Sequence, residues 1–331
     1  MVTYQEEGVT QAANIQRKHH QPELRPLGPE SNTWRDFGSY RFHLMLPQAF
    51  VLQSAHPVID AAVSKEKKYK LDPWGRAKGS TKLLWPVVYS RPDKAIEMGH
   101  RLRELHREIK GTDKDGNRYH ALDPEAYSWV HITGFDATLR MYEYFGTRLS
   151  REQREAMFGE WKQMGALLGI HEKHIPQTQD EYWKHFDYII EQRLEWGDVL
   201  DDLMDPGFYA AYPRPEELKK LPMPIFRLLM KGMGWFMHKI TIATLPETFR
   251  RRFDVRFSKT DQRLFRLFAW SVRTFYPLVP ERMQYIPLAW RAIQDSRRHP
   301  DAYELDAYEP DAYEPDGNER DEGDLSLAAS S

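Results

Sequence analysis

The chain has 331 residues, of which 41% are hydrophobic and 13% aromatic, and its formal net charge is −2. That apolar content is enough to bury a sizeable core, as one large domain or two small ones. Because there are no cysteines, the sequence excludes disulfides, zinc–thiolate sites, iron–sulfur clusters, cysteine nucleophiles, covalent c-type haem and thiolate-ligated haem. Any metal must be held by His, carboxylate, Tyr or Met.

The N-terminal stretch, residues 1–38, is polar with scattered proline and glycine, and we expect an arm that is ordered only where it packs on the body. It lacks an apolar h-region, so a secretory signal is not expected. The longest apolar stretch, 223–246, is interrupted by arginine, lysine and histidine, so no transmembrane segment is expected. These features predict a cytoplasmic protein. Residues 223–246 either belong to the core or form an exposed apolar face for weak peripheral membrane contact.

Helical periodicity dominates residues 39–298, and strand alternation is nearly absent. His56 stands before a proline in the apolar segment 53–63, which indicates either a helix break lining a cavity or a simple bend. Further along, Arg76, Lys78, Ser80 and Thr81 precede an apolar run. As donors at a helix start they would stabilise iron-bound dioxygen or a propionate. The alternative is that they form only the cap of a helix and a solvated basic loop before it.

The next predicted helix, 90–109, places a histidine on an apolar face. Leu102, Leu105, His106 and Ile109 share that face at i, i+3, i+4, i+7 spacing. A buried His106 imidazole is either a hydrogen-bonded core residue or a ligand to buried iron. Arg103, one turn earlier, would pair with a haem propionate or form a surface salt bridge.

A turn-rich link, 111–124, with room for a short hairpin, leads to a helix that Asp123 caps. This helix carries His131 on its apolar face, and the two histidines could line the same cavity. Further helices are predicted at 150–169, 178–195, 222–240, 246–254, 259–275 and 287–296. The fold class is therefore all-α, with one large helical domain over 39–298.

The C-terminal segment, 299–331, is different in composition. An Asp-Ala-Tyr-Glu motif recurs every five residues, at Asp301, Asp306 and Asp311. From Asp301 onward there are 11 acidic residues and one arginine, which leaves 46 basic and 38 acidic residues in the remainder. We expect a disordered acidic tail, either a docking segment or one without a role. The mildly basic remainder has no clustered stripe for nucleic acid.

Other chemistries lack their motifs. A di-iron bundle needs two Glu-x-x-His motifs on facing helices, and only Glu97 to His100 fits. His171 and His174 stand in a loop too short for a zinc motif. There is no nucleophile elbow, phosphate loop or dinucleotide fingerprint.

Several stretches together resemble the MpaB/rubber oxygenase family, which includes the latex clearing proteins and the oxygenase of mycophenolic acid biosynthesis. They are "AHPVIDAAV", "DPWGRAKGST", "RLRELHREIKG", "RYHALDPEAYSWVHITGFDATLRMYEYFG", "LSREQREAMFGEWKQMGALLGI" and "HIPQTQDEYWKHFDYII", with "ATLPETFRRRF" and "LVPERMQYIPLAWRAI" later. The resemblance covers about residues 40–296. The Arg-x-x-His pattern followed by Trp-Val-His is its most specific part.

The resemblance implies a globin-like helical fold around non-covalent haem b, with dioxygen as co-substrate. It implies that His106 is the proximal iron ligand, that Arg103 is its neighbour, and that Arg76 and Thr81, with Lys78 beside them, form the distal segment. His131 matches a second family histidine that supports the pocket. The Arg76–Thr81 spacing is one residue longer than the family pattern, and His56 lies near the place of the glutamate of rubber-cleaving members.

We therefore expect a haem b-dependent oxygenase or oxidase that oxidises a hydrophobic or aromatic small molecule, with a role in secondary metabolism. In this hypothesis Arg76, Thr81 and Lys78 stabilise negative charge on bound oxygen, and a dry apolar lining excludes water. The alternatives are a haem-binding sensor or carrier without turnover, and a helical protein whose histidines make only core hydrogen bonds.

Overall fold

The computed structural model describes residues 24–304. The predicted arm before residue 24 and the predicted tail after residue 304 lie outside the described residues. The α-helices of the first half are α2 (Asn32–Asp36), α3 (Tyr40–His43), α4 (Leu46–Ser54), α5 (Pro57–Glu66), α6 (Lys68–Leu71), α7 (Pro73–Tyr89), α8 (Pro92–Arg107), α9 (Pro124–Phe145) and α10 (Arg151–Leu167). Those of the second half are α11 (Gln179–Tyr188), α12 (Asp198–Met204), α13 (Met223–Thr244), α14 (Glu247–Arg252), α15 (Lys259–Phe275), α16 (Glu281–Gln284) and α17 (Pro287–Arg298).

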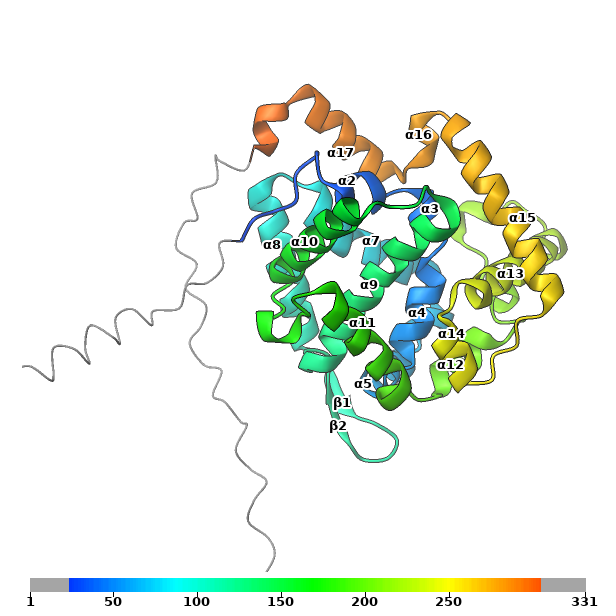
Figure 1. Ribbon diagram of the computed structural model, residues 1–331. Coiled ribbons are helices and arrows are strands. Elements are labelled where there is room, and N and C mark those ends of the chain that lie inside the picture. The colour runs from blue at the N-terminus through cyan, green and yellow to red at the C-terminus, as the bar shows by residue number, and fades with distance from the viewer. Residues whose placement is uncertain (1–23, 305–331) are drawn as a thin grey trace, which may run out of the picture.

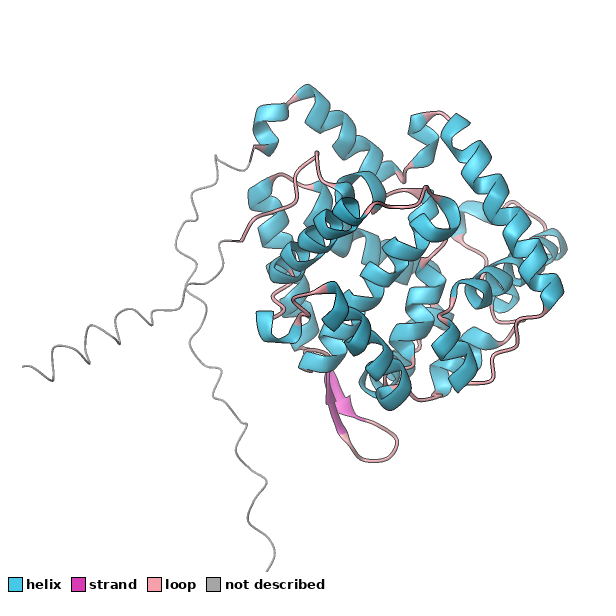
Figure 2. Cartoon of the chain, viewed as in Figure 1, coloured by secondary structure: helices cyan, strands magenta, loops and turns pink. Residues whose placement is uncertain are grey.

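Short elements connect these helices. They are the strands β1 (Lys110–Thr112) and β2 (Arg118–His120), the turns η1 (Glu172–His174), η3 (Tyr209–Ala211), η4 (Glu216–Leu218), η5 (Tyr276–Leu278) and η6 (Pro300–Tyr303), and the π-turn η2 (Ile189–Arg193). The strands pair antiparallel, with Lys110 opposite His120, and form the short hairpin that the link sequence predicted. Figure 2 shows that the rest of the described chain is helix and loop, so the all-α prediction is confirmed.

Side-chain caps fix the helix starts where the sequence placed them. The Asp123 carboxylate accepts the Ala126 N–H at the start of α9. At α10 the Ser150 hydroxyl and the Gln153 side chain cap each other's backbone N–H groups. Each of these bonds satisfies an N–H that has no partner within the helix. Local chemistry therefore determines these boundaries without tertiary contacts.

Helix α9 forms the centre of the molecule, with α4, α10 and α15 packed around it (Figure 1). It buries Trp129, Ile132, Phe135 and Met141, among others, in a hydrophobic core that extends from Leu27 to Tyr303. None of the helices within residues 24–304 combines the length and hydrophobicity needed to cross a bilayer.

The ordered body extends beyond the predicted boundaries at 39 and 298. Trp34 in α2 is buried, and its indole N–H donates to the Leu27 carbonyl at 2.7 Å. At the other end Tyr303 in η6 lies edge-to-face against Trp34, with ring centres 5.5 Å apart. The composition of these segments is polar, but single aromatic residues anchor them, and a window average conceals such residues.

Candidate functional site

Helices α7 and α8 form an antiparallel hairpin that brings two of the predicted site residues to the same level. Only Ser90 and Arg91 separate the helices, which pack against each other. Arg76 lies 14 residues before Ser90, and His106 lies 15 residues after Arg91. Both therefore lie at the open end of the hairpin, away from its turn. The strand β1, which follows α8, and helix α5 adjoin this end of the molecule (Figure 1).

His106 has one ring nitrogen engaged and one without a partner. Its Nδ1 lies 2.7 Å from the Leu102 carbonyl oxygen, so Nδ1–H is the donor and Nε2 carries the lone pair. Its ring lies edge-to-face against Tyr127 of α9, with centres 5.5 Å apart. Within residues 24–304 no group bonds to Nε2. A backbone carbonyl that fixes the imidazole tautomer in this way is a common partner of a metal-ligating histidine.

The end of α8 is less buried than the sequence predicted. His106 is half-buried and Leu105 is 44% exposed, whereas the buried residues of α8 are Ala95, Ile96, Met98 and Gly99. The fully buried residues of α8 thus end before its last two turns, where the half-buried Leu102 still packs against the core. The neighbouring helix α5 also has no buried residue, although Val58, Ile59 and Val63 are apolar. Two apolar segments that are only partly covered therefore adjoin the β-hairpin.

Arg76 is a half-buried cation without a counter-charge. Its guanidinium lies 4.3 Å from the centre of the Phe50 ring in a cation–π contact. In the described part of the chain it makes no hydrogen bond or ion pair. Burial consequently lowers the pKa of Arg76. A desolvated guanidinium of this kind favours an anionic ligand.

The structure does not gather Thr81 and Lys78 around Arg76. Thr81 is five residues from Arg76 on the continuous helix α7, about 140° around the axis, and its hydroxyl donates to the Ala77 carbonyl at 2.9 Å. Lys78 is exposed and pairs with Glu217 of η4, with 2.5 Å between Nζ and Oε1. Helical rotation thus directs the three side chains differently, and one distal cluster formed by them stays a prediction.

Arg103 connects α8 to the end of α10. Its Nη1 donates to the Gly169 carbonyl at 2.9 Å. Gly169 has a φ of +71°, and a Cβ built there would lie 2.7 Å from the Arg103 side chain. Arg103 thereby helps to hold the helix that bears His106 in place. Its predicted pairing with a haem propionate or a surface carboxylate stays a prediction.

His131 is a packed core residue. Its Nε2 lies 2.8 Å from the Trp161 carbonyl, its ring stacks on the Trp161 indole at 4.6 Å, and the Trp161 N–H donates to the His131 carbonyl at 3.0 Å. Burial lowers the pKa of His131 to about 4. These contacts assign the ring to the α9–α10 interface. They support the predicted pocket only indirectly, by fixing α9, and the prediction of direct cofactor contact finds no geometric support.

A buried histidine at the α4–α5 bend pairs with a glutamate, and the sequence predicted only the bend. His56 is 3% exposed, and its Nε2 lies 3.3 Å from Glu125 at the start of α9. Glu125 also accepts from Arg193 at 2.7 Å. The His56 Nδ1 is buried without a partner, and burial lowers the pKa of His56. The proline after His56 marked the bend, but nothing local in the sequence pointed to Glu125 as its partner.

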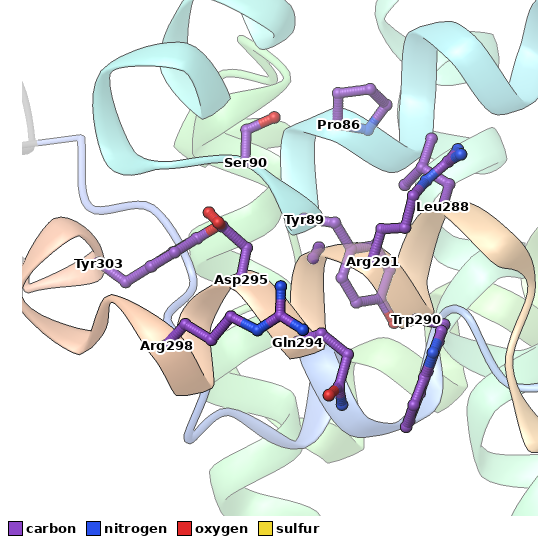
Figure 3. Close-up of a pocket in the computed structure, with 11 residues that line it drawn as sticks. Pro86, Tyr89, Ser90, Leu288, Trp290, Arg291, Gln294, Asp295, Arg298 and Tyr303 are labelled. Atoms are coloured by element: carbon purple, nitrogen blue, oxygen red, sulfur yellow. The ribbon is translucent and has the colours of Figure 1, made fainter. Parts of the chain in front are cut away.

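Two cavities lie away from these residues. The first, about 700 Å³, opens between the end of α7 and α17, where Tyr89, Arg291 and Arg298 line it (Figure 3). It lies at the turn of the α7–α8 hairpin, opposite the end that bears His106. The second, about 740 Å³, is bordered by Glu160 of α10 and by residues near the two ends of the described range, among them Leu27 and Tyr303. None of the residues predicted from the sequence lines either cavity. Within residues 24–304 no three His, Asp or Glu residues cluster as a metal site.

Comparison with known proteins identifies relatives over most of the chain. Residues 34–274 match the family described as ER-bound oxygenase mpaB/B'/Rubber oxygenase, catalytic domain. Two similar relatives are the uncharacterized protein Mb2261 of Mycobacterium bovis and the uncharacterized protein Rv2237 of Mycobacterium tuberculosis. Each is 24% identical over 249 residues, which cover 72% of this chain and 91% of the relative. No solved structure matches the chain.

Proposed function

This chain belongs to the mpaB/rubber oxygenase family, and from that membership we propose that it is a haem b-dependent oxygenase with His106 as the proximal ligand. The observation that carries this proposal is the state of the His106 ring. Its Nδ1–H is held by the Leu102 carbonyl, which leaves the Nε2 lone pair without a partner among the described residues. A neutral imidazole with one fixed tautomer would be able to hold the haem iron through Nε2.

The surroundings of His106 include apolar surface that a large planar cofactor would be able to cover. The last two turns of α8 and the whole of α5 present apolar side chains that no neighbouring element fully covers. A porphyrin placed against them would cover that apolar surface, and the gain would contribute to binding. When bound, the haem supplies the chemistry that activates dioxygen.

The remaining predicted residues would hold or position groups. Arg76 would hold a propionate or stabilise negative charge on the reacting oxygen, because it has no counter-charge among residues 24–304. The Thr81 oxygen retains lone pairs for a second hydrogen bond while its proton is donated to the Ala77 carbonyl. Arg103 would act as a positioning residue through its bond to Gly169.

The proposed substrate is a hydrophobic or aromatic small molecule. Val58 and Ala62, one turn apart on α5, are half-buried but do not belong to the hydrophobic core. Such side chains would contact an apolar substrate and exclude water from it. A role in secondary metabolism is part of the same proposal.

The test is the absorption spectrum of the full chain with a pyridine haemochrome assay. We expect a Soret band in the wild type, and at least about a tenfold loss of haem affinity in His106→Ala. His100→Ala, on the same helix, is the matched control and should retain the band. An unchanged spectrum of His106→Ala would remove that residue from its role. Dioxygen consumption with apolar alkenes or aromatics then distinguishes an oxygenase from a haem sensor or carrier.

A further inference from the structure

The surface formed by α13 and α15 exposes an unusual amount of apolar side chain. Of the 21 large apolar residues that are exposed in the described chain, 13 lie between Met223 and Met283. They are Met223, Ile225, Leu228, Leu229, Met233, Trp235, Phe236, Leu264, Leu267, Trp270, Phe275, Leu278 and Met283. Scattered single residues of this type are normal, but a concentration on one part of the surface indicates an interaction site.

Helix α13 is apolar on both its sides. Phe226, Met230 and Gly234 face inward at i, i+4, i+8 spacing, and a Cβ on Gly234 would lie 2.9 Å from Tyr209. On the opposite side of the helix, Leu228 is 72% exposed and Trp235 is 51% exposed. Core packing therefore accounts for one side only. The other side has no partner among the described residues.

Helices α13 and α15 lie side by side, so that their exposed residues form one surface. The rings of Phe236 and Phe268 pack edge-to-face at 5.1 Å, and Lys239 pairs with Asp261 at 2.9 Å. Figure 1 shows the two helices together at the right-hand edge of the molecule, on the side away from α8 and α10. Eleven of these 13 exposed apolar residues lie on α13 and α15, and we name them, with the basic residues of the same two helices, the α13–α15 face.

The charge of this face has one sign. Its basic residues are Arg227, Lys231, Lys239, Lys259, Arg263, Arg266 and Arg273, and the only acidic residue of the two helices is Asp261. Asp261 is already paired with Lys239. The other six cations form no ion pair with any residue of the described chain. They alternate with exposed apolar residues, so that their long aliphatic stems border the apolar surface.

We propose that the α13–α15 face docks on a lipid bilayer that contains anionic lipids, with both helices lying in the plane of the interface. Apolar residues that include Trp235 and Trp270 would enter the boundary between headgroups and acyl chains, where indole rings are favoured. The unpaired cations would contact anionic headgroups.

A second copy of the chain fits the face less well. A two-fold contact of the face with itself would bring its unpaired arginines and lysines together, and like charges at an interface oppose association. An anionic bilayer satisfies both the apolar side chains and the cations. The proposal depends on α13 and α15 alone and does not require that the chain binds haem.

The experiment is co-sedimentation of the full chain with vesicles of phosphatidylcholine alone or with 30% phosphatidylserine. We expect binding to the anionic vesicles, weaker binding to the neutral ones, and a decrease as salt rises to 0.5 M. Arg227→Glu combined with Arg266→Glu should weaken binding at least about tenfold. Leu228→Ser combined with Leu267→Ser should weaken it as well, since both leucines are exposed and their loss leaves the core intact.

The controls are exposed residues outside the face. Leu71→Ser and Lys173→Glu should bind anionic vesicles as the wild type does, and circular dichroism should show all variants equally folded. Two results would overturn the proposal. One is a wild-type chain that does not bind anionic vesicles. The other is a wild-type dimer in sedimentation equilibrium that dissociates in the Leu228/Leu267 variant, which would assign the face to a second copy.

Discussion

Two neighbouring helices each carry a histidine, and the two regions differ in how many hydrogen-bond and packing partners the imidazole ring has. At the α9–α10 interface His131 has a stacking partner, a bonded Nε2 and a pKa lowered to about 4 by burial. At the end of α8 His106 is half-buried, and its Nε2 is without a partner in the described chain. The residue type is the same, and both stand on apolar helix faces.

The difference shows that an apolar neighbourhood does not identify a ligand histidine. The His131 ring is surrounded by aromatic side chains, and its Nε2 is bonded to a backbone carbonyl. Its role is therefore packing. The His106 ring is oriented by one hydrogen bond and otherwise available. A free lone pair on a fixed ring, more than burial, is the property that separates a candidate ligand from a core residue.

The largest expected effect is on stability at the first region. His131→Ala removes the stack on Trp161 and the 2.8 Å bond to its carbonyl, so we expect the free energy of unfolding to fall by about 2–4 kcal/mol. His106→Ala should cost about 1 kcal/mol or less in the cofactor-free protein, since its ring is half-buried. Urea unfolding of both variants measures the contrast, and equal losses would contradict the distinction between the regions.

Glycine substitutions on α10 test how tightly the first region is packed. A Cβ at Gly165 would lie 2.6 Å from Ile175 and 2.9 Å from the His131 ring, whereas a Cβ at Gly159 meets nothing within 4 Å. Gly165→Ala should therefore destabilise the fold by about 1–3 kcal/mol. Gly159→Ala should be neutral or slightly stabilising, because alanine favours the helix. A tolerated Gly165→Ala would show that the interface relaxes more easily than its geometry indicates.

The pH dependence of stability should carry the signature of His131. Its pKa is about 4 in the folded chain against a usual 6.5, so the unfolded chain binds more protons between these values. The contribution is fully present above pH 6.5 and is lost as the pH falls toward 4. Between pH 7 and pH 5.5 it should decrease by about 1 kcal/mol. Unfolding curves of the wild type and His131→Gln at the two pH values give this difference, which should be absent in the variant.

The smallest effect is expected at Lys78, which was predicted to belong to the second region. Its ion pair with Glu217 is on the surface, where such pairs contribute little. Lys78→Ala should leave haem uptake and the unfolding midpoint unchanged, whereas Arg76→Ala should reduce haem uptake. Absorption titration with haem compares the two. A loss with Lys78→Ala as large as with Arg76→Ala would show that Lys78 turns toward the site in solution.

The sequence predicted most of the secondary structure because the signals are local. The Asp123 and Ser150 caps begin α9 and α10 as expected. The helix predicted over 178–195 instead continues from Ile189 to Arg193 as a π-helix, where the distant Arg252 guanidinium donates to the Ile190 carbonyl at 2.7 Å. Arg252 is 62 residues from Ile190 in the sequence, so no local pattern predicts this bond.

The candidate site could be predicted only in part. The family pattern located His106, Arg76 and Thr81, and helix geometry alone would have shown that Arg76 and Thr81 point to different sides of α7. Burial was the weaker prediction. The apolar stripe of α8 indicated a buried His106, but the last fully buried residue of that helix is Gly99, and His106 is half-buried.

Composition, helical periodicity and capping residues by themselves determined an all-helical, cysteine-free chain and the order of its main helices, because each depends on contacts within a few residues. Within residues 24–304, the tertiary structure decided which histidine is packed and which has a free nitrogen, and that the apolar faces of α13 and α15 remain uncovered. Those properties depend on which helices, distant in sequence, pack against a given face. No local pattern of residues determines that packing.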